Sequence, residues 1–320
     1  MARTKQEWLQ LARARILSIL AERGVCPIRM LEAKISEAGP GDKRPNPLSI
    51  TLALRDLVNK GNVKMLPKKA VKDTPFYLPG WVDPESAAVK EPFFMRLYLY
   101  RLHKMWTEQN QYCSDVLETI VDKAIGRAGI AKFVSRFPNQ HLPPGRPLDS
   151  VFDVGGVLCG CEAKNYREWI YPDSYEVWAA LSKCCELDAA PVFVTRKLPY
   201  VTRVLFGKVG VLGYETHFQY FHPVIEPELT RIRDVDGLGY KDIKTTLEPD
   251  ENLVRFFGTT VAKHATDFKK RFQSAKGIIQ EFADQRELGN RNLNLSTRAP
   301  VFAEAWRALF GDKLSEDLEV

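Results

Sequence analysis

One stretch decides the fold of the middle of this chain: Pro147-Leu148-Asp149-Ser150-Val151-Phe152-Asp153-Val154-Gly155-Gly156-Val157-Leu158-Cys159-Gly160-Cys161-Glu162-Ala163-Lys164-Asn165. Gly155-Gly156 lies between two β-prone runs and predicts a tight β-hairpin, because primed two-residue turns require positive φ angles. Counting outwards from that turn places Asp149 opposite Glu162. Lys164 lies two residues beyond Glu162, so strand alternation puts it on the same face of the hairpin.

Two carboxylates facing each other across a hairpin form a destabilising like-charge pair, about 5 Å apart. A divalent metal ion gives such a pair a purpose, because Mg²⁺ prefers hard oxygen ligands and leaves room for water and phosphate. An ammonium group beside the ion can orient the attacking water and stabilise charge that develops on phosphate oxygens. Asp149, Glu162 and Lys164 therefore predict a site for metal-assisted hydrolysis of a phosphate ester.

Asp149 followed by Glu162-Ala163-Lys164 resembles the core motif of the PD-(D/E)xK nuclease superfamily. The resemblance implies that Asp149 and Glu162 hold Mg²⁺ or Mn²⁺, that the carbonyl group of Ala163 completes the ligand set and that Lys164 positions the attacking water. Holliday-junction resolvases and Mrr-type restriction endonucleases share such a core. The alternative for the bare motif is an ordinary surface pair of Glu162 and Lys164.

The sequence around the hairpin fits an αβββαβ-type order of elements, which the same resemblance implies. Residues 112–125 read as an amphipathic helix that carries Glu118 beside its apolar stripe. The superfamily often has an acidic residue on this helix, so Glu118 is a further candidate for the metal site; the alternative is a solvent-exposed glutamate. Further elements are expected downstream of the hairpin: a helix at 174–186, a buried parallel strand at 191–195, a helix at 200–206 and a strand at 209–214.

Two more positions of the hairpin have structural interpretations. Asp153 shares a strand face with Asp149 but lies near the turn, where we interpret it as a hairpin-end acid. Cys159 and Cys161 alternate with Glu162, so they are expected on the opposite face as small buried side chains beneath a helix.

Residues 1–80 carry 15 Lys and Arg against 7 Asp and Glu, an excess of eight positive charges in a chain with a net charge of +6. Helices are expected at 7–23, 27–38 and 49–60, followed by a β-hairpin of 63–66 and 76–78 with a basic turn. Three helices and a basic hairpin resemble a winged helix-turn-helix domain, whose recognition helix enters the major groove of DNA. Many winged helices instead mediate protein contacts, and a transcription repressor is an alternative for this module alone.

The expected DNA contacts belong to three groups of polar and basic side chains. The recognition helix, the wing and the end of the 191–195 strand supply them: Ser49, Thr51, Arg55 and Lys60; Lys64, Lys68, Lys69 and Lys72; Arg196 and Lys197.

Pro and Gly residues at 79–84 and 92 predict a linker over 81–92, between the DNA-binding module and a nuclease core of residues 93–222 that starts with a helix at 93–106. After Pro223 the sequence loses strand character, and residues 223–320 are expected to form a helical extension. A helix at 251–285 has an apolar stripe and several lysines, for which packing within the subunit, a dimer seam and a DNA-facing ridge all remain open. A last helix is expected at 297–310.

Several classes of protein lack support in this sequence. Six cysteines show no Cys-x-x-Cys pair and five histidines no metal-ligand spacing, so reduced thiols in a cytoplasmic protein are the simplest account. No apolar run reaches the roughly 20 residues that a membrane span requires. Serine-hydrolase, P-loop and dinucleotide-binding motifs are missing.

These observations predict an α/β protein: a restriction-endonuclease-like core with a mixed sheet, preceded by a winged helix and followed by a helical extension. The predicted activity is that of a metal-dependent DNA endonuclease in restriction, defence or recombination. DNA is the expected partner, and a homodimer or partner proteins of a defence or recombination system remain open. Two alternatives stand beside it: a DNA-binding regulator with a catalytically silent core, and a nuclease subunit of a larger transposition or defence assembly.

Overall fold

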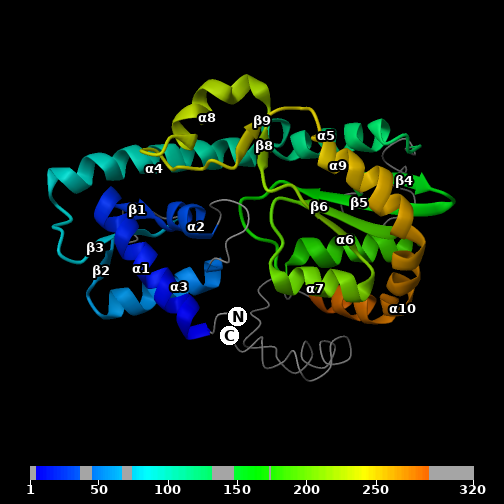
Figure 1. The fold of residues 1–320 in the computed structure, drawn as a ribbon, viewed down its shortest axis with the longest axis horizontal. Coiled ribbons are helices and arrows are strands. Elements are labelled where there is room, and N and C mark those ends of the chain that lie inside the picture. Colours follow the sequence, from blue (N-terminus) through cyan, green and yellow to red (C-terminus); the bar gives the residue numbers. More distant parts are fainter. Residues whose placement is uncertain (1–4, 37–44, 67–73, 132–147, 173, 288–320) are drawn as a thin grey trace. The chain divides into compact units, whose positions relative to one another are not determined.

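The computed structural model describes residues 5–36, 45–66, 74–131, 148–172 and 174–287. Its contacts divide the chain into two units, one formed by residues 1–109 with 224–243 and the other by residues 110–223 with 244–320. Both units combine helices with strands (Figure 1). No helix within these ranges is long and apolar enough to cross a lipid bilayer.

The first unit holds a three-stranded antiparallel sheet in the order β1-β3-β2. Asn46 caps α3 by accepting a hydrogen bond from the backbone nitrogen of Ser49 at 2.7 Å, and Pro47 provides a preset φ angle in the first turn. The elements of this unit are α1 (Lys5–Arg23), β1 (Cys26–Pro27), α2 (Ile28–Ser36), α3 (Pro47–Asn59), β2 (Val63–Met65), β3 (Phe76–Pro79), α4 (Ala87–Glu108) and α8 (Glu226–Arg233).

Two apolar clusters hold this unit together. The first joins one side of α1, α2 and α3, with Ile16, Leu31 and Leu54 at its centre. The second packs α4 against β3 through the rings of Phe76 and Phe93, whose centroids are 5.0 Å apart. Arg96, only 4% exposed, donates hydrogen bonds to the backbone carbonyls that follow α1 and so ties α4 to that loop.

The second unit is built on a mixed sheet in the order β4-β5-β6-β7. β4 and β5 are antiparallel, whereas β5, β6 and β7 are parallel. A two-stranded sheet of β8 and β9 lies apart from it. The elements are α5 (Ser114–Arg127), β4 (Ser150–Val154), β5 (Val157–Lys164), α6 (Tyr175–Glu186), β6 (Ala190–Thr195), α7 (Tyr200–Val209), β7 (Leu212–Glu215), β8 (Gln219–Phe221), β9 (Ile243–Thr245), α9 (Glu251–Arg255), a π-helical turn (Phe256–Val261) and α10 (Ala262–Glu287); 3-10 turns cover Asn110–Tyr112 and Pro223–Ile225.

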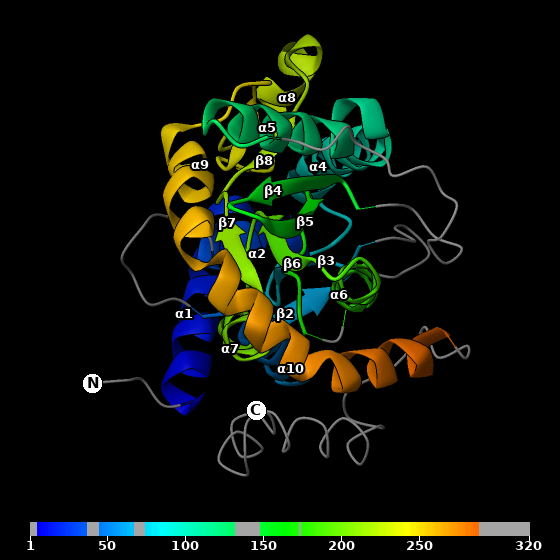
Figure 2. The ribbon, with the colours of Figure 1, turned by 90° about the vertical axis from the view of Figure 1, so that its right-hand side faces the viewer.

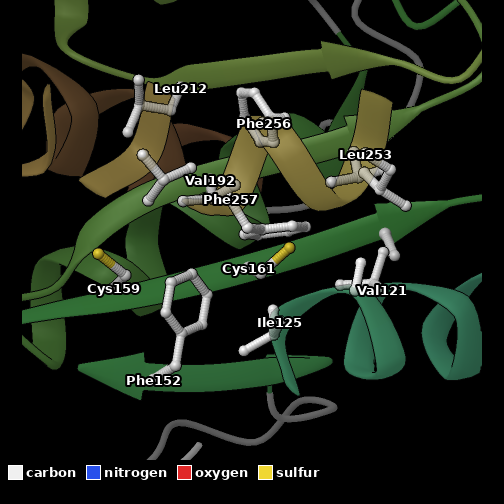
Figure 3. Close-up of a cluster of buried hydrophobic side chains, with 14 of the residues drawn as sticks. Val121, Ile125, Phe152, Cys159, Cys161, Val192, Leu212, Leu253, Phe256 and Phe257 are labelled. Atoms are coloured by element: carbon white, nitrogen blue, oxygen red, sulfur yellow. The ribbon is translucent and has the colours of Figure 1, made fainter. Parts of the chain in front are cut away.

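Helices cover both faces of the mixed sheet (Figure 2). On one face α5, α9 and the π-helical turn enclose Phe152, Cys159 and Cys161, with Phe257 packed edge-on against Phe152 at 5.7 Å (Figure 3). On the other face α6, α7 and α10 cover a second cluster that includes Phe193. The expected burial of both cysteines beneath a helix is confirmed.

The hairpin at the centre of the sequence has the expected register. Val154 pairs with Val157 and Asp153 with Leu158, and both turn glycines have positive φ angles, 59° and 84°. Asp153 accepts a hydrogen bond from the backbone nitrogen of Gly156 at 2.9 Å, as expected of a hairpin-end acid. The sequence determines this register because a two-residue turn fixes every cross-strand pair that follows it.

Other sequence expectations need correction. The chain does not lose strand character after Pro223, because β9 lies in that region and pairs with β8. Cys26–Pro27 forms a strand before α2, and α4 begins at Ala87, so that the expected linker includes its first turns and Pro92. The expected turn of Lys68, Lys69 and Lys72 and the helix at 297–310 lie outside the described residues.

The observed division into units also differs from the expected boundaries at 93 and 223. α4 groups with the N-terminal unit, although its first residues were expected to begin the nuclease core. Residues 251–287 do not form a separate extension: Leu253–Ala265 pack into one cluster of the mixed sheet and Phe272–Ile279 into the other. For the 251–285 helix, packing within the subunit is therefore the alternative that the contacts support.

The close packing of α7 against α10 gives a stability prediction. Gly210 ends α7 with a φ angle of 79°, and a Cβ there would collide with the backbone oxygen of Phe268 and lie 2.6 Å from the backbone nitrogen of Phe272. We expect Gly210→Ala to lower the free energy of unfolding by about 2–4 kcal/mol. Gly207→Ala is the control, because no atom lies within 4 Å of its Cβ position and alanine favours the helix. Equal urea midpoints for the two variants would contradict this packing.

Candidate active site

Asp149 lies one residue before β4, beyond the last paired residues of the hairpin, Ser150 and Cys161. Its Oδ2 accepts a hydrogen bond from the backbone nitrogen of Ala163 at 2.7 Å. This bond extends the contact between the two strands by one step and holds the carboxylate beside Glu162. The sequence prediction that these two carboxylates meet agrees with this register and with their electrostatic interaction.

Glu162 is the most buried member of the cluster, with 5% of its surface exposed. Its Oε1 lies 2.5 Å from Nζ of Lys164, and its Oε2 lies 3.9 Å from Nζ of Lys183 on α6. Oε2 is fully buried and accepts no hydrogen bond within the described part of the chain. A buried carboxylate oxygen without a hydrogen bond is costly, and binding of a cation would satisfy it.

Lys164 ends β5 and lies between the two acids. Burial by itself would lower the pKa of Lys164, but the carboxylates of Glu162 and Asp149 outweigh burial and raise that pKa. The side chain is therefore an ammonium group at neutral pH. Such a group can donate hydrogen bonds and stabilise negative charge, but it cannot accept a proton until neighbouring charges change.

Both remaining acids of the site have raised pKa values. Burial, followed by the charge of Glu162, raises the pKa of Asp149 to about 6. Burial, followed by the charge of Asp149, raises the pKa of Glu118 on α5 to about 7. Glu118 therefore interacts electrostatically with the hairpin residues, and the structure brings all four candidate site residues into one cluster.

These shifts predict how pH affects the stability of the metal-free protein. A carboxyl group whose pKa rises on folding stabilises the fold below its unfolded value and loses that contribution as pH rises through its folded value. For Glu118 the window runs from about 4.5 to about 7. We expect the melting temperature of Glu118→Gln to rise relative to wild type across this window.

Differential scanning calorimetry at several pH values would measure this difference. Glu228→Gln, at an exposed position of α8, is the control and should keep a constant difference from wild type. A difference for Glu118→Gln that does not change with pH would contradict the buried environment of Glu118.

The residues around the hairpin end fit a magnesium or manganese ion. Within the described ranges no three His, Cys, Asp or Glu side chains form a metal-binding group. Mg²⁺ does not need three, because it commonly binds one or two carboxylates and keeps several water ligands. Asp149 and Glu162 supply two carboxylates, and the free Oε2 of Glu162 is an oxygen that such an ion would satisfy.

Two polar side chains fix the elements around this cluster. Ser150 donates a hydrogen bond to Oδ1 of Asp122, which connects α5 to β4. Asn165 bonds to the carbonyl oxygen of Cys113 at 2.7 Å and to both backbone groups of Tyr220, so it pins the end of β5 beside Lys164. Preorganised neighbours of this kind hold catalytic groups in place.

The structure corrects one expected phosphate contact. Arg196 is fully buried, and its guanidinium group donates hydrogen bonds to the carbonyl oxygens of Tyr166 and Arg167. It holds the loop after β5 and cannot reach DNA. Lys197 is only partly buried and lies 3.0 Å from Nδ1 of His217, beyond the end of β6. Lys197 thus remains a candidate.

The expected contacts of the first unit lie on or next to α3. Arg55 and Thr51 are exposed on this helix and Ser49 is partly exposed. Lys60 pairs with Asp56 at 3.0 Å, and Lys64 on β2 donates to the carbonyl oxygen of Val82 at 3.1 Å. Both lysines remain exposed, so these contacts do not exclude a role at a phosphate backbone.

Sequence reasoning missed Lys183, whose ammonium group is the second one near Glu162. No motif marks it, because it is one lysine among several on an amphipathic helix 19 residues after Lys164. Only the packing of α6 on the sheet brings it to the carboxylate. Comparison with family models, with curated proteins and with solved structures found no match to this chain.

Proposed function

We propose that this protein is a metal-dependent endodeoxyribonuclease that hydrolyses phosphodiester bonds of DNA, with a restriction-endonuclease-like second unit. The observation that carries the proposal is the buried acid pair at the end of the hairpin. Asp149 and Glu162 adjoin each other, Lys164 lies 2.5 Å from Glu162, and Oε2 of Glu162 accepts no hydrogen bond from the described residues. A fold gains nothing from such a pair by itself.

In this proposal Asp149 and Glu162, with the carbonyl group of Ala163, would hold Mg²⁺ or Mn²⁺. The ion, when bound, would polarise the phosphate group and lower the pKa of the attacking water. Lys164 donates hydrogen bonds that orient this water in line with the phosphorus atom and stabilise the equatorial oxygens. Glu118, whose pKa of about 7 is close to neutral pH, is suited to accept a proton during attack.

We further infer that the first unit is a winged helix that binds DNA. Its support is the order of three helices followed by antiparallel strands, the exposed Arg55 on α3 and the excess of positive charge in residues 1–80. In a winged helix α3 would enter the major groove, and the basic segment between β2 and β3 would contact phosphates. Such a unit would raise the local concentration of DNA at the acid pair.

The test incubates the purified full chain with plasmid, single-stranded and branched DNA, with Mg²⁺, with Mn²⁺ and with chelator. Metal-dependent cleavage of any form would support the proposal. Metal-dependent stabilisation without cleavage would favour the nuclease subunit of a larger assembly. DNA binding with neither cleavage nor stabilisation by metal would instead favour the regulator with a silent core.

A substitution on α3 tests the DNA-binding part separately. Arg55→Ala should weaken binding of preferred sequences by about 1–3 kcal/mol more than binding of random duplex, if Arg55 contacts a base edge. Arg101→Ala, at an exposed position of α4, is the control and should change neither affinity. Fluorescence anisotropy at several salt concentrations would measure both. Equal affinities of Arg55→Ala and wild type for all duplexes would contradict a recognition role for α3.

A further inference from the structure

The outward face of α4 carries large apolar side chains that nothing in the described chain covers. Phe94 is 63% exposed, Tyr98 is 57% exposed and Met105 is 41% exposed. The opposite face of the same helix is buried in the first unit, through Val89 and Phe93 among others. Three large apolar side chains on one helix face form the kind of patch that marks an interaction surface.

The exposed positions on this face follow a seven-residue repeat. They are separated alternately by four and three residues, which is the a/d spacing of a coiled coil. Over 22 residues α4 is about 33 Å long, long enough for three such repeats. We call these positions the α4 stripe: Ala87, Glu91, Phe94, Tyr98, Arg101, Met105 and Glu108.

Two charged residues within the α4 stripe indicate what covers it. Glu91 and Arg101 form no ion pair within the described residues, and they lie on either side of Phe94 and Tyr98. A second α4 that runs antiparallel, related by a two-fold axis between Phe94 and Tyr98, faces each Glu91 with Arg101 of the second copy. The same register places Phe94 against the other copy's Tyr98, and Ala87 against its Met105.

Other ways of pairing two copies bring like charges together. A parallel pair places Glu91 against Glu91 and Arg101 against Arg101. An antiparallel pair shifted by one heptad places Glu91 against Glu108. Charges that face each other in a helical seam set register and direction, because a buried like-charge contact is strongly unfavourable.

We propose that the α4 stripe is a homodimer interface, formed by antiparallel pairing with α4 of a second copy in the register that joins Glu91 to Arg101. Each copy contributes an aromatic centre and two charged ends, and every layer of the seam has a complementary partner. The pairing does not depend on the nuclease proposal, because no residue of the acid pair takes part in it.

The test measures the dimer dissociation constant of the full chain by sedimentation velocity, without DNA. Wild type is expected to dimerise. Glu91→Arg and Arg101→Glu should each raise the dissociation constant at least about tenfold, because each creates two like-charge contacts. The double variant Glu91→Arg/Arg101→Glu should return it close to the wild-type value, since the swapped charges again attract.

Glu108→Arg is the matched control, because Glu108 faces no helical residue in the proposed register and should leave the constant unchanged. In the register shifted by one heptad the same substitution would instead tighten the dimer. A wild type that stays monomeric at all concentrations overturns the proposal, as does a double variant that stays as weak as the single ones. Circular dichroism melts of each variant would confirm folding, which these exposed positions should not impair.

Discussion

Replacement of Lys164 by alanine is expected to reduce DNA cleavage by about 100- to 1000-fold, with little change in DNA affinity. The ammonium group lies 2.5 Å from Glu162, at the end of β5 where the proposed metal ligands converge. Its proposed contacts are with the attacking water and the charged oxygens of the transition state, whereas bound DNA in the ground state does not need them. The loss should therefore fall on the rate constant of single-turnover cleavage.

The matched control is Lys123→Ala. Lys123 also forms a 2.5 Å ion pair with a glutamate, Glu248, but both side chains are exposed and distant in sequence from the motif. Exposed pairs of this kind contribute at most about 1 kcal/mol, so this variant should cleave like wild type. A Lys164→Ala variant that cleaves at the wild-type rate while folded would exclude the proposed role of Lys164.

Replacement of Asp149 by asparagine is expected to abolish cleavage and, without metal, to raise stability. The amide oxygen can still accept the hydrogen bond from Ala163, but the charge that opposes Glu162 is gone. Because the pKa of Asp149 rises from 3.8 to about 6 on folding, its ionised form costs stability, and this cost increases as pH rises through that window. Allowing for solvent screening, the variant should gain about 1–2 kcal/mol above pH 6 and nothing below pH 4.

Metal should reverse the order of the two proteins. At a Mg²⁺ concentration of about 100 times the dissociation constant, wild type should gain about 2.7 kcal/mol, whereas Asp149→Asn should gain much less. Asp153→Asn, on the same strand but at the hairpin turn, is the control and should keep the full metal effect. Thermal unfolding with chelator and with Mg²⁺ measures these differences. Equal metal stabilisation of wild type and Asp149→Asn would rule out Asp149 as a ligand.

The sequence predicted the hairpin and its register because the determinants are local. A glycine pair forces a tight turn, and side-chain alternation then places Asp149 beside Glu162 and Lys164 on the same face. The wholly apolar run at 191–195 predicted a buried parallel strand for a similar reason, and β6 confirms it. These patterns depend on neighbours a few residues apart.

Arg196 shows where local reasoning fails. Arginine at the end of a strand is usually exposed, which favoured a phosphate contact. In the structure its guanidinium group is buried because the loop after β5 offers it two carbonyl oxygens about 30 residues away in sequence. No pattern within the neighbourhood of Arg196 contains that information.

The sequence by itself therefore determined the paired acids, the adjacent lysine and most of the helices and strands. Only the tertiary structure decided that Glu118 joins the acids, that Lys183 lies at Glu162, that α4 belongs with the N-terminal unit and that residues 251–287 pack on both faces of the mixed sheet. The physical reason is the range of the interactions. Turn geometry and side-chain periodicity act between residues close in sequence, whereas burial and the pairing of charges depend on which distant segments pack together.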